Sequence, residues 1–154
     1  MPSIRDATKE DIEFLAKNLR EDDRAELTAA TGSKNIQQIL SEGWTASSVC
    51  KVAIDDSAEP FAIFGVVPMG ERTGSVWMAA TPEIEDNWLF SGRKTLEWVK
   101  ELFKGYLLLG NYVHAQNDLH IKWLKWAGFT FTSQSVFINN NLFLEFFMEA
   151  PADV

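Results

Sequence analysis

The sequence predicts an α/β protein built on a mixed, mainly antiparallel sheet. A nearly continuous apolar run at 61–67, rich in β-branched and aromatic residues, is typical of a buried central strand. Strand-like segments at 48–54 and 75–81 flank this run and are separated from it by turn sequences with proline or glycine. A helical segment at 117–127 then lies between two further strand-like segments. Sheet strands and helices therefore alternate in the second half of the chain.

The stretch from Tyr112 to Phe129 is the clearest local pattern and predicts a strand, a capped helix and a stop. Asn117 or Asp118 is a suitable N-cap, and Gly128 is a suitable C-cap. On this spacing His120 is expected to face solvent. The predicted buried face of the helix consists of Leu119, Trp123, Trp126 and Ala127.

The N-terminal third is predicted to hold an edge strand followed by helices. Residues 3–7 form the strand, and Thr8 with Asp11 forms a capping box that begins the first helix. Further helices are predicted at 21–30 and 35–42, and each is followed by a glycine that would end it. Several helices therefore precede the main sheet.

The remaining elements are predicted from apolar spacing and turn residues. Residues 82–87 are acidic and expected to be irregular, and the next helix carries apolar residues from Leu89 to Phe103 at helical spacing. A strand is expected at 107–115, and a last hairpin with Asn139–Asn141 at its tip. The side chains predicted to form the core are Phe64, Val66, Leu96, Val99, Trp123 and Phe129.

Length and composition predict one domain over residues 1–150, with a loose tail at 151–154. Hydrophobic residues make up 46% and charged residues 23%, an ordinary globular mixture. The single cysteine, Cys50, excludes an internal disulfide and a cysteine-based metal cluster, and no metal site is predicted. No apolar run approaches the roughly 20 residues of a membrane span. A net charge of −8 argues against nucleic-acid binding through phosphates.

Asn117 at the start of a helix that ends in Gly128-Phe129 resembles the C-terminal half of the GCN5-related N-acetyltransferase (GNAT) fold. The order of elements is similar to that fold along nearly the whole chain. The resemblance implies a sheet of six or seven strands with helices on both faces. It also implies that the strands at 76–81 and 107–115 run parallel and diverge near Thr81 and Gln116, with acetyl-coenzyme A in the cleft between them.

The resemblance also implies a set of cofactor-binding residues. The backbone of the strand at 76–81 would pair with the pantetheine arm, although its two alanines could equally pack under a helix. The family's glycine-rich pyrophosphate loop keeps only one glycine here, so neighbouring polar and basic side chains would supply the contacts. Asn117 would contact the cofactor or act only as an N-cap. The implied cofactor-binding residues are Met78, Ala79, Ala80, Ser91, Gly92, Arg93, Lys94 and Asn117.

Catalytic residues are less clearly marked. The tyrosine that many members carry seven residues after the helix asparagine, as an acid toward the departing thiolate, is Leu124 here. By position, Glu83 and His114 are the catalytic candidates, as bases that deprotonate an amine. Glu85 is a further possibility, and a histidine in a strand is more often simply packed. The acidic N-terminal helices would favour a cationic acceptor.

Residues 75–130 more closely resemble a family of small tailed-phage proteins, labelled as GNAT-like or as internal virion proteins of podoviruses. This implies a phage origin and a location in the host cytoplasm or the virion. Two functions follow. The first is transfer of an acetyl group from acetyl-coenzyme A to an amine of a protein or small molecule. The second is a non-catalytic protein that acts in virion assembly or binds a host protein.

Overall fold

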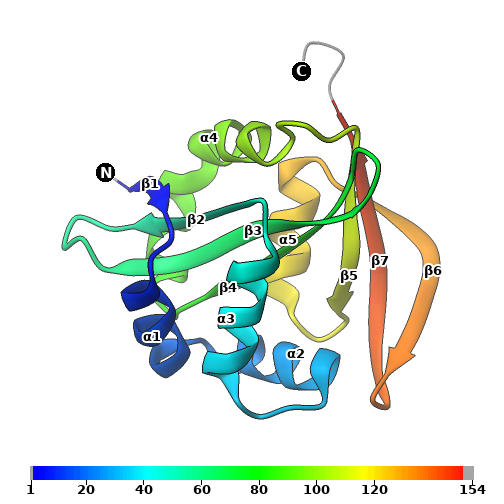
Figure 1. The fold of residues 1–154 in the computed structure, drawn as a ribbon, viewed down its shortest axis with the longest axis horizontal. Helices are drawn as coiled ribbons and strands as arrows, with labels where there is room; N and C mark the ends of the chain where they lie inside the picture. Colours follow the sequence, from blue (N-terminus) through cyan, green and yellow to red (C-terminus); the bar gives the residue numbers. More distant parts are fainter. Residues whose placement is uncertain (1, 151–154) are drawn as a thin grey trace.

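The computed structural model describes residues 2–150, and the side chains of all of these except 88–95. The chain forms one seven-stranded sheet and five helices within the described residues (Figure 1). In order, the elements are β1 (Ser3–Asp6), α1 (Lys9–Asn18), α2 (Glu21–Thr31), α3 (Ile36–Ala46), β2 (Val49–Ile54), β3 (Pro60–Gly70), β4 (Thr73–Ala80), α4 (Ile84–Leu102), β5 (Leu108–His114), α5 (Asp118–Ala127), β6 (Thr130–Ile138) and β7 (Asn141–Glu149).

The strand order across the sheet is β1-β2-β3-β4-β5-β7-β6, and β1 lies at the edge as predicted. Every neighbouring pair is antiparallel except β4 and β5, which are parallel. The prediction of a mixed, mainly antiparallel sheet is therefore confirmed. The parallel pair sits at the centre, where the N-terminal half of the sheet meets the C-terminal half (Figure 1).

Helices cover both faces of the sheet, because successive residues of the central strands point to opposite sides. On one face Ile63 and Ala79 pack against apolar residues of α1 and α3. On the other face Phe64 and Val66 pack against residues of α4 and α5. Of the predicted core, Phe64, Val66, Val99 and Phe129 are buried, which confirms those four.

Two predicted core residues require correction. Leu96 is 50% exposed, because the buried stripe of α4 falls on Trp98, Val99 and Leu102 instead. Trp123 is only half-buried and packs against the edge of the core. The predicted face of α5 is therefore displaced by about one residue.

The residues that α5 buries are His120, Leu124 and Ala127, whereas Trp126 is 47% exposed. The expectation that His120 faces solvent is wrong, since only 2% of this residue is exposed. Apolar spacing alone places a histidine outside. Its burial becomes favourable only because carboxylates of α2 lie beside it.

Most predicted boundaries hold, with two exceptions. The capping box of Thr8 and Asp11 and the left-handed C-caps Gly32 and Gly128 are confirmed. Helix α3, however, continues past Gly43 to Ala46. A Cβ atom at Gly43 would lie 3.0 Å from the Trp77 ring, so this glycine allows close packing rather than ending the helix.

The second exception is the start of α4. Residues 82–87 were expected to be irregular, but the helix begins at Ile84, directly after β4. The hairpin tip is as predicted: Asn139 and Asn140 have φ values of 49° and 65°, which asparagine tolerates in a tight turn.

Candidate functional site

Strands β4 and β5 pair only over a short length and then separate. Their parallel register joins Thr73–Ser75 to Leu108–Gly110. The next link is a side chain: Asn111 Nδ2 donates a hydrogen bond of 2.8 Å to the Val76 carbonyl. The prediction that these strands are parallel neighbours which diverge is confirmed, although divergence begins at Val76 rather than near Thr81.

A cavity of about 150 Å³ lies where the two strands separate. Most of its wall is apolar and comes from the central strands, α2, α5 and β7, including Met78, Val113, Leu124, Phe129 and Phe146. Two charged side chains also line it, Glu26 from α2 and His120 from α5. The cavity therefore combines an apolar wall with an acid–base pair.

Beyond the cavity, the ends of β4 and α5 are joined by a buried carboxylate of α2, Asp23. Its Oδ1 accepts hydrogen bonds from Arg20 Nη1 at 2.8 Å and from Asn117 Nδ2 at 3.0 Å. Its Oδ2 accepts the backbone N–H of Ala80. One carboxylate thus connects three elements that lie far apart in the sequence.

The backbone at the start of α2 contacts the same point. The N–H of Arg20 donates a hydrogen bond of 2.9 Å to the Ala80 carbonyl. Both backbone polar groups of Ala80 are therefore bonded to the first turn of α2. These two hydrogen bonds use the backbone groups of β4 that would bond to β5 if the two strands stayed paired.

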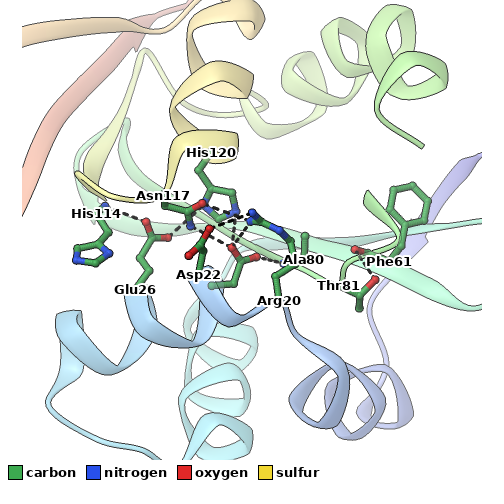
Figure 2. Close-up of polar contacts among 10 residues, drawn as sticks. Arg20, Asp22, Glu26, Phe61, Ala80, Thr81, His114, Asn117 and His120 are labelled. Atoms are coloured by element: carbon green, nitrogen blue, oxygen red, sulfur yellow. Dashed lines mark hydrogen bonds and ion pairs between the residues drawn. The ribbon is translucent and has the colours of Figure 1, made fainter. Parts of the chain in front are cut away.

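Glu26 and His120 form the next layer of this network (Figure 2). Glu26 Oε2 accepts the backbone N–H of His114 at 2.9 Å, and its Oε1 lies 3.2 Å from His120 Nδ1. His120 Nε2 lies 3.3 Å from Asp23 Oδ1, within ion-pair distance. The alignment is not that of a hydrogen bond, so Nε2 has no hydrogen-bond partner among the described residues.

Burial and charge act in opposite directions on this histidine. Burial by itself would lower the pKa of His120, but the carboxylates of Asp23 and Glu26 outweigh it and raise the pKa to about 10. Burial would likewise raise the pKa of Asp23, but His120, Asn117 and Arg20 hold it below its ordinary value. Asp23 is therefore held as a carboxylate that faces a protonated His120.

The structure places the predicted strand residues in different environments. Met78 lines the cavity, whereas Ala79 and Ala80 are fully buried in the two core layers. Asn117 precedes α5 at the N-cap position, but its side chain is 0% exposed and bonds to Asp23 and Arg20 rather than to the helix backbone.

The predicted pyrophosphate residues lie elsewhere than expected. Residues 91–94 belong to the interior of α4, seven or more residues after it begins, where backbone N–H groups bond within the helix. The resemblance implied a pyrophosphate-binding loop here, whereas the structure has these residues within a helix. The side chains of Ser91, Arg93 and Lys94 lie outside the described residues, and Gly92 falls in the same stretch.

Of the predicted bases, Glu83 is exposed at the N-cap of α4, and His114 is buried against the Phe143 ring. Neither is among the described residues that line the cavity. Arg20, Asp23, Glu26 and His120 are the site residues that sequence reasoning missed. One signal was available: α2 is rich in charge and has no clear apolar stripe, so it must dock on the sheet partly through polar contacts.

The described residues contain neither a metal-binding group of side chains nor a membrane-spanning helix. No group of three or more histidine, cysteine, aspartate or glutamate side chains there could hold a metal ion. No helix in that part of the chain is long and apolar enough to cross a membrane.

Comparison with models of protein families and with curated proteins finds no match for this sequence. Solved structures do match. Spermidine N-acetyltransferase from Vibrio cholerae in complex with CoA and spermine has a TM-score of 0.67 at 13% identity, over 96% of this chain and 95% of that one.

Two other structures are similar over the same length. The GNAT superfamily phosphinothricin acetyltransferase from Sinorhizobium meliloti in complex with AcCoA has a TM-score of 0.70 at 11% identity, over 96% of this chain and 88% of that one. IAA acetyltransferase from Bacillus cereus has a TM-score of 0.63 at 14% identity, over 97% of this chain and all of the other. The chain therefore has the fold of the GNAT N-acetyltransferases.

Proposed function

We propose that the protein transfers an acetyl group from acetyl-coenzyme A to an amine. The observation that carries this proposal is the cavity between the diverging parts of β4 and β5. Divergence of these two strands is where the GNAT resemblance locates acetyl-coenzyme A. Two of the similar structures are complexes with CoA or AcCoA, which supports the same assignment.

The backbone of β4 offers groups for the pantetheine arm. The Val76 carbonyl and the Ala80 N–H both point from β4 toward the gap. Because strand residues alternate, the N–H and C=O of Met78 point the same way. Met78 is therefore the residue whose backbone would pair with an amide of the arm, next to the apolar cavity wall.

The acceptor we propose is a cationic amine of a protein or small molecule. Acidic side chains lie exposed on the ends of the elements that meet at Ala80 and Asn117, namely Asp22, Glu83 and Asp118. Carboxylates around a cleft attract cations and raise their local concentration. The contacts of Arg93 and Lys94 with the pyrophosphate and the role of Glu83 or His114 as a base stay predictions.

Calorimetric titration with acetyl-coenzyme A, together with an assay of thiol release in the presence of amines such as spermidine, tests the proposal. Val113→Phe adds a ring inside the cavity and is expected to weaken binding at least tenfold. Trp126→Phe, on the exposed side of α5, is the matched control and should leave binding unchanged. Failure of the wild type to bind or release thiol would contradict the proposal.

A second function is favoured by one observation. The backbone groups of Ala80 and the side chain of Asn117 are already bonded to α2. A cleft closed by the chain's own groups fits a non-catalytic protein that binds a partner, such as a virion or host protein if the chain has a phage origin. Absence of acetyl-coenzyme A binding by the folded wild type would favour this alternative.

A further inference from the structure

Three titratable side chains line the cavity among the described residues: Glu26, Tyr112 and His120. The Tyr112 hydroxyl donates a hydrogen bond of 3.1 Å to Glu145, which is not part of the described wall. Glu26 and His120 remain, and they contact each other at 3.2 Å. The cavity therefore contains one carboxylate and one imidazole in direct contact.

The two ring nitrogens of His120 have different surroundings. Nδ1 faces Glu26, whereas Nε2 lies 3.3 Å from Asp23 Oδ1 and makes no hydrogen bond to it or to any other described residue. A buried N–H without a hydrogen-bonded acceptor costs free energy, and a ligand atom that accepts its hydrogen bond would remove that cost. Because His120 also lines the cavity, Nε2 is the ring nitrogen available to hydrogen-bond a ligand there.

The charges around His120 keep a proton available. Asp23 and Glu26 face it from α2, and Arg20 bonds to Asp23. Among the described residues, the backbone N–H of His114 in β5 contacts Glu26, and Asn117, the N-cap of α5, bonds to Asp23. The carboxylates hold the imidazole protonated at neutral pH.

We propose that His120 is the acid and Glu26 the base of the transfer, an inference that rests on the proposed function. The reacting amine nitrogen, in its neutral form, forms a bond to the thioester carbon and gives one proton to Glu26. The C–S bond breaks, and the departing thiolate takes the Nε2 proton of His120. Glu26 then releases its proton to solvent and His120 regains one, so that the products are the amide and the free thiol of coenzyme A.

The contact between Glu26 and His120 makes His120 a stronger acid once Glu26 has been protonated. Before reaction, two carboxylates hold the proton on His120. Once Glu26 has taken the amine proton it is neutral, and one of these two attractions is lost. Protonation of Glu26 therefore favours proton transfer from His120 to sulfur. Leu124, four residues further on the same helical face, stands where the GNAT resemblance expects a tyrosine acid.

The test measures thiol release with acetyl-coenzyme A and spermidine by the wild type, His120→Gln, Glu26→Gln and the double variant His120→Gln with Leu124→Tyr. General acid–base groups contribute about 100-fold to 10,000-fold. We expect each single variant to lower kcat at least about 100-fold with KM for acetyl-coenzyme A within about threefold of the wild type. In the double variant, Leu124→Tyr should raise kcat at least tenfold above that of His120→Gln alone. Asp11→Asn, which removes a buried charge far from the cavity, should keep the wild-type rate.

Different outcomes separate the two proposals. An active wild type with kcat retained in folded His120→Gln would overturn the acid assignment and leave the proposed function standing. An inactive wild type that does not bind acetyl-coenzyme A would overturn both. If His120→Gln does not fold, nitrogen NMR of the wild type decides. Binding of coenzyme A should then shift the Nε2 resonance of His120, and an unchanged resonance in the complex would count against the assignment.

Discussion

Two polar clusters on the N-terminal helices differ in how far along the chain they reach. The Thr8 cluster, made of Arg5, Thr8 and Asp11, spans a sequence separation of six residues and begins α1. The Asp23 cluster, made of Arg20, Asp23, Glu26, Asn117 and His120, joins α2 to residues 94 to 97 positions away. The first stabilises a helix end, whereas the second joins three elements across the gap between β4 and β5.

The difference shows that losing a polar contact affects stability differently in a local cluster and in a cluster that joins distant parts of the chain. In the Thr8 cluster Asp11 is buried, but 40% of the arginine side chain is accessible, so water can replace the contacts that the arginine loses. In the Asp23 cluster Asp23 and His120 are at most 2% exposed, so a broken pair leaves a charge in a medium that cannot solvate it. Mutations should therefore be costlier in the second cluster.

The largest effect is expected from Asp23→Ala. The substitution removes the carboxylate that accepts hydrogen bonds from the Ala80 N–H, Asn117 Nδ2 and Arg20. It also leaves the buried His120 with one counter-charge fewer. Breaking a buried ion pair by removing one partner costs about 3–5 kcal/mol. Urea unfolding of the variant and the wild type measures this loss, and a change below about 1 kcal/mol would contradict the role given to the cluster.

The pH dependence of stability should come next in size. The pKa of His120 is raised to about 10 in the folded state, against about 6.5 in the unfolded chain. The unfolded chain thus loses its proton first, so the contribution of His120 is fully present below pH 6.5 and declines as the pH rises toward 10. The free energy of unfolding should fall steadily between pH 7 and 9.

A control separates this histidine from Cys50, a half-buried thiol that titrates at alkaline pH. Burial, with Asp6 and Asp11 nearby, raises the pKa of the Cys50 thiol to about 12, so its effect begins only near pH 9. In His120→Gln the decline between pH 7 and 9 should disappear, whereas in Cys50→Ala it should remain. A wild type of constant stability over this range would show that His120 is not held protonated.

The same contrast explains what the sequence could and could not predict. The strands and the helix caps of Thr8, Gly32 and Gly128 depend on local patterns, and these were predicted. The divergence of β4 from β5 was predicted from the GNAT resemblance, although it begins earlier than expected. The burial of His120 depends on Asp23 and Glu26, which are 97 and 94 residues away. Apolar periodicity contains no information on such a pair, so it placed the histidine in solvent.

The helix α4 shows a second limit. Its first turn contains Glu85 and Asp86, which are favourable at a helix N-terminus, yet the acidic stretch also has the composition of a loop. Local propensity could not decide between the two, and the predicted start was too late. The cofactor assignment of residues 91–94 depended on that start.

A smaller effect is expected at the Thr8 cluster from Thr8→Ala. The hydroxyl accepts the Asp11 N–H at 3.3 Å and donates to the Asp11 carboxylate at 2.9 Å. Loss of an N-cap side chain typically costs about 1 kcal/mol. Urea unfolding should show a change of that size, well below that of Asp23→Ala. Thr8→Ser, which retains the hydroxyl, should recover most of it.

The smallest effect is expected from Arg5→Ala. Its guanidinium contacts both oxygens of Asp11, at 2.6 and 2.9 Å, and this geometry alone would indicate a strong ion pair. The arginine side chain is 40% accessible, however, and Asp11, although buried, keeps the N–H and hydroxyl of Thr8 when the arginine is lost. Ion pairs that water can reach contribute about 0.2–1 kcal/mol and are weakened by salt. The difference in unfolding free energy between Arg5→Ala and the wild type should therefore lie within this range in dilute buffer and shrink further in 1 M salt, where the Debye length is about 3 Å. If Arg5→Ala lowered the free energy of unfolding as much as Asp23→Ala, the sequence separation within a cluster would not decide its contribution to stability.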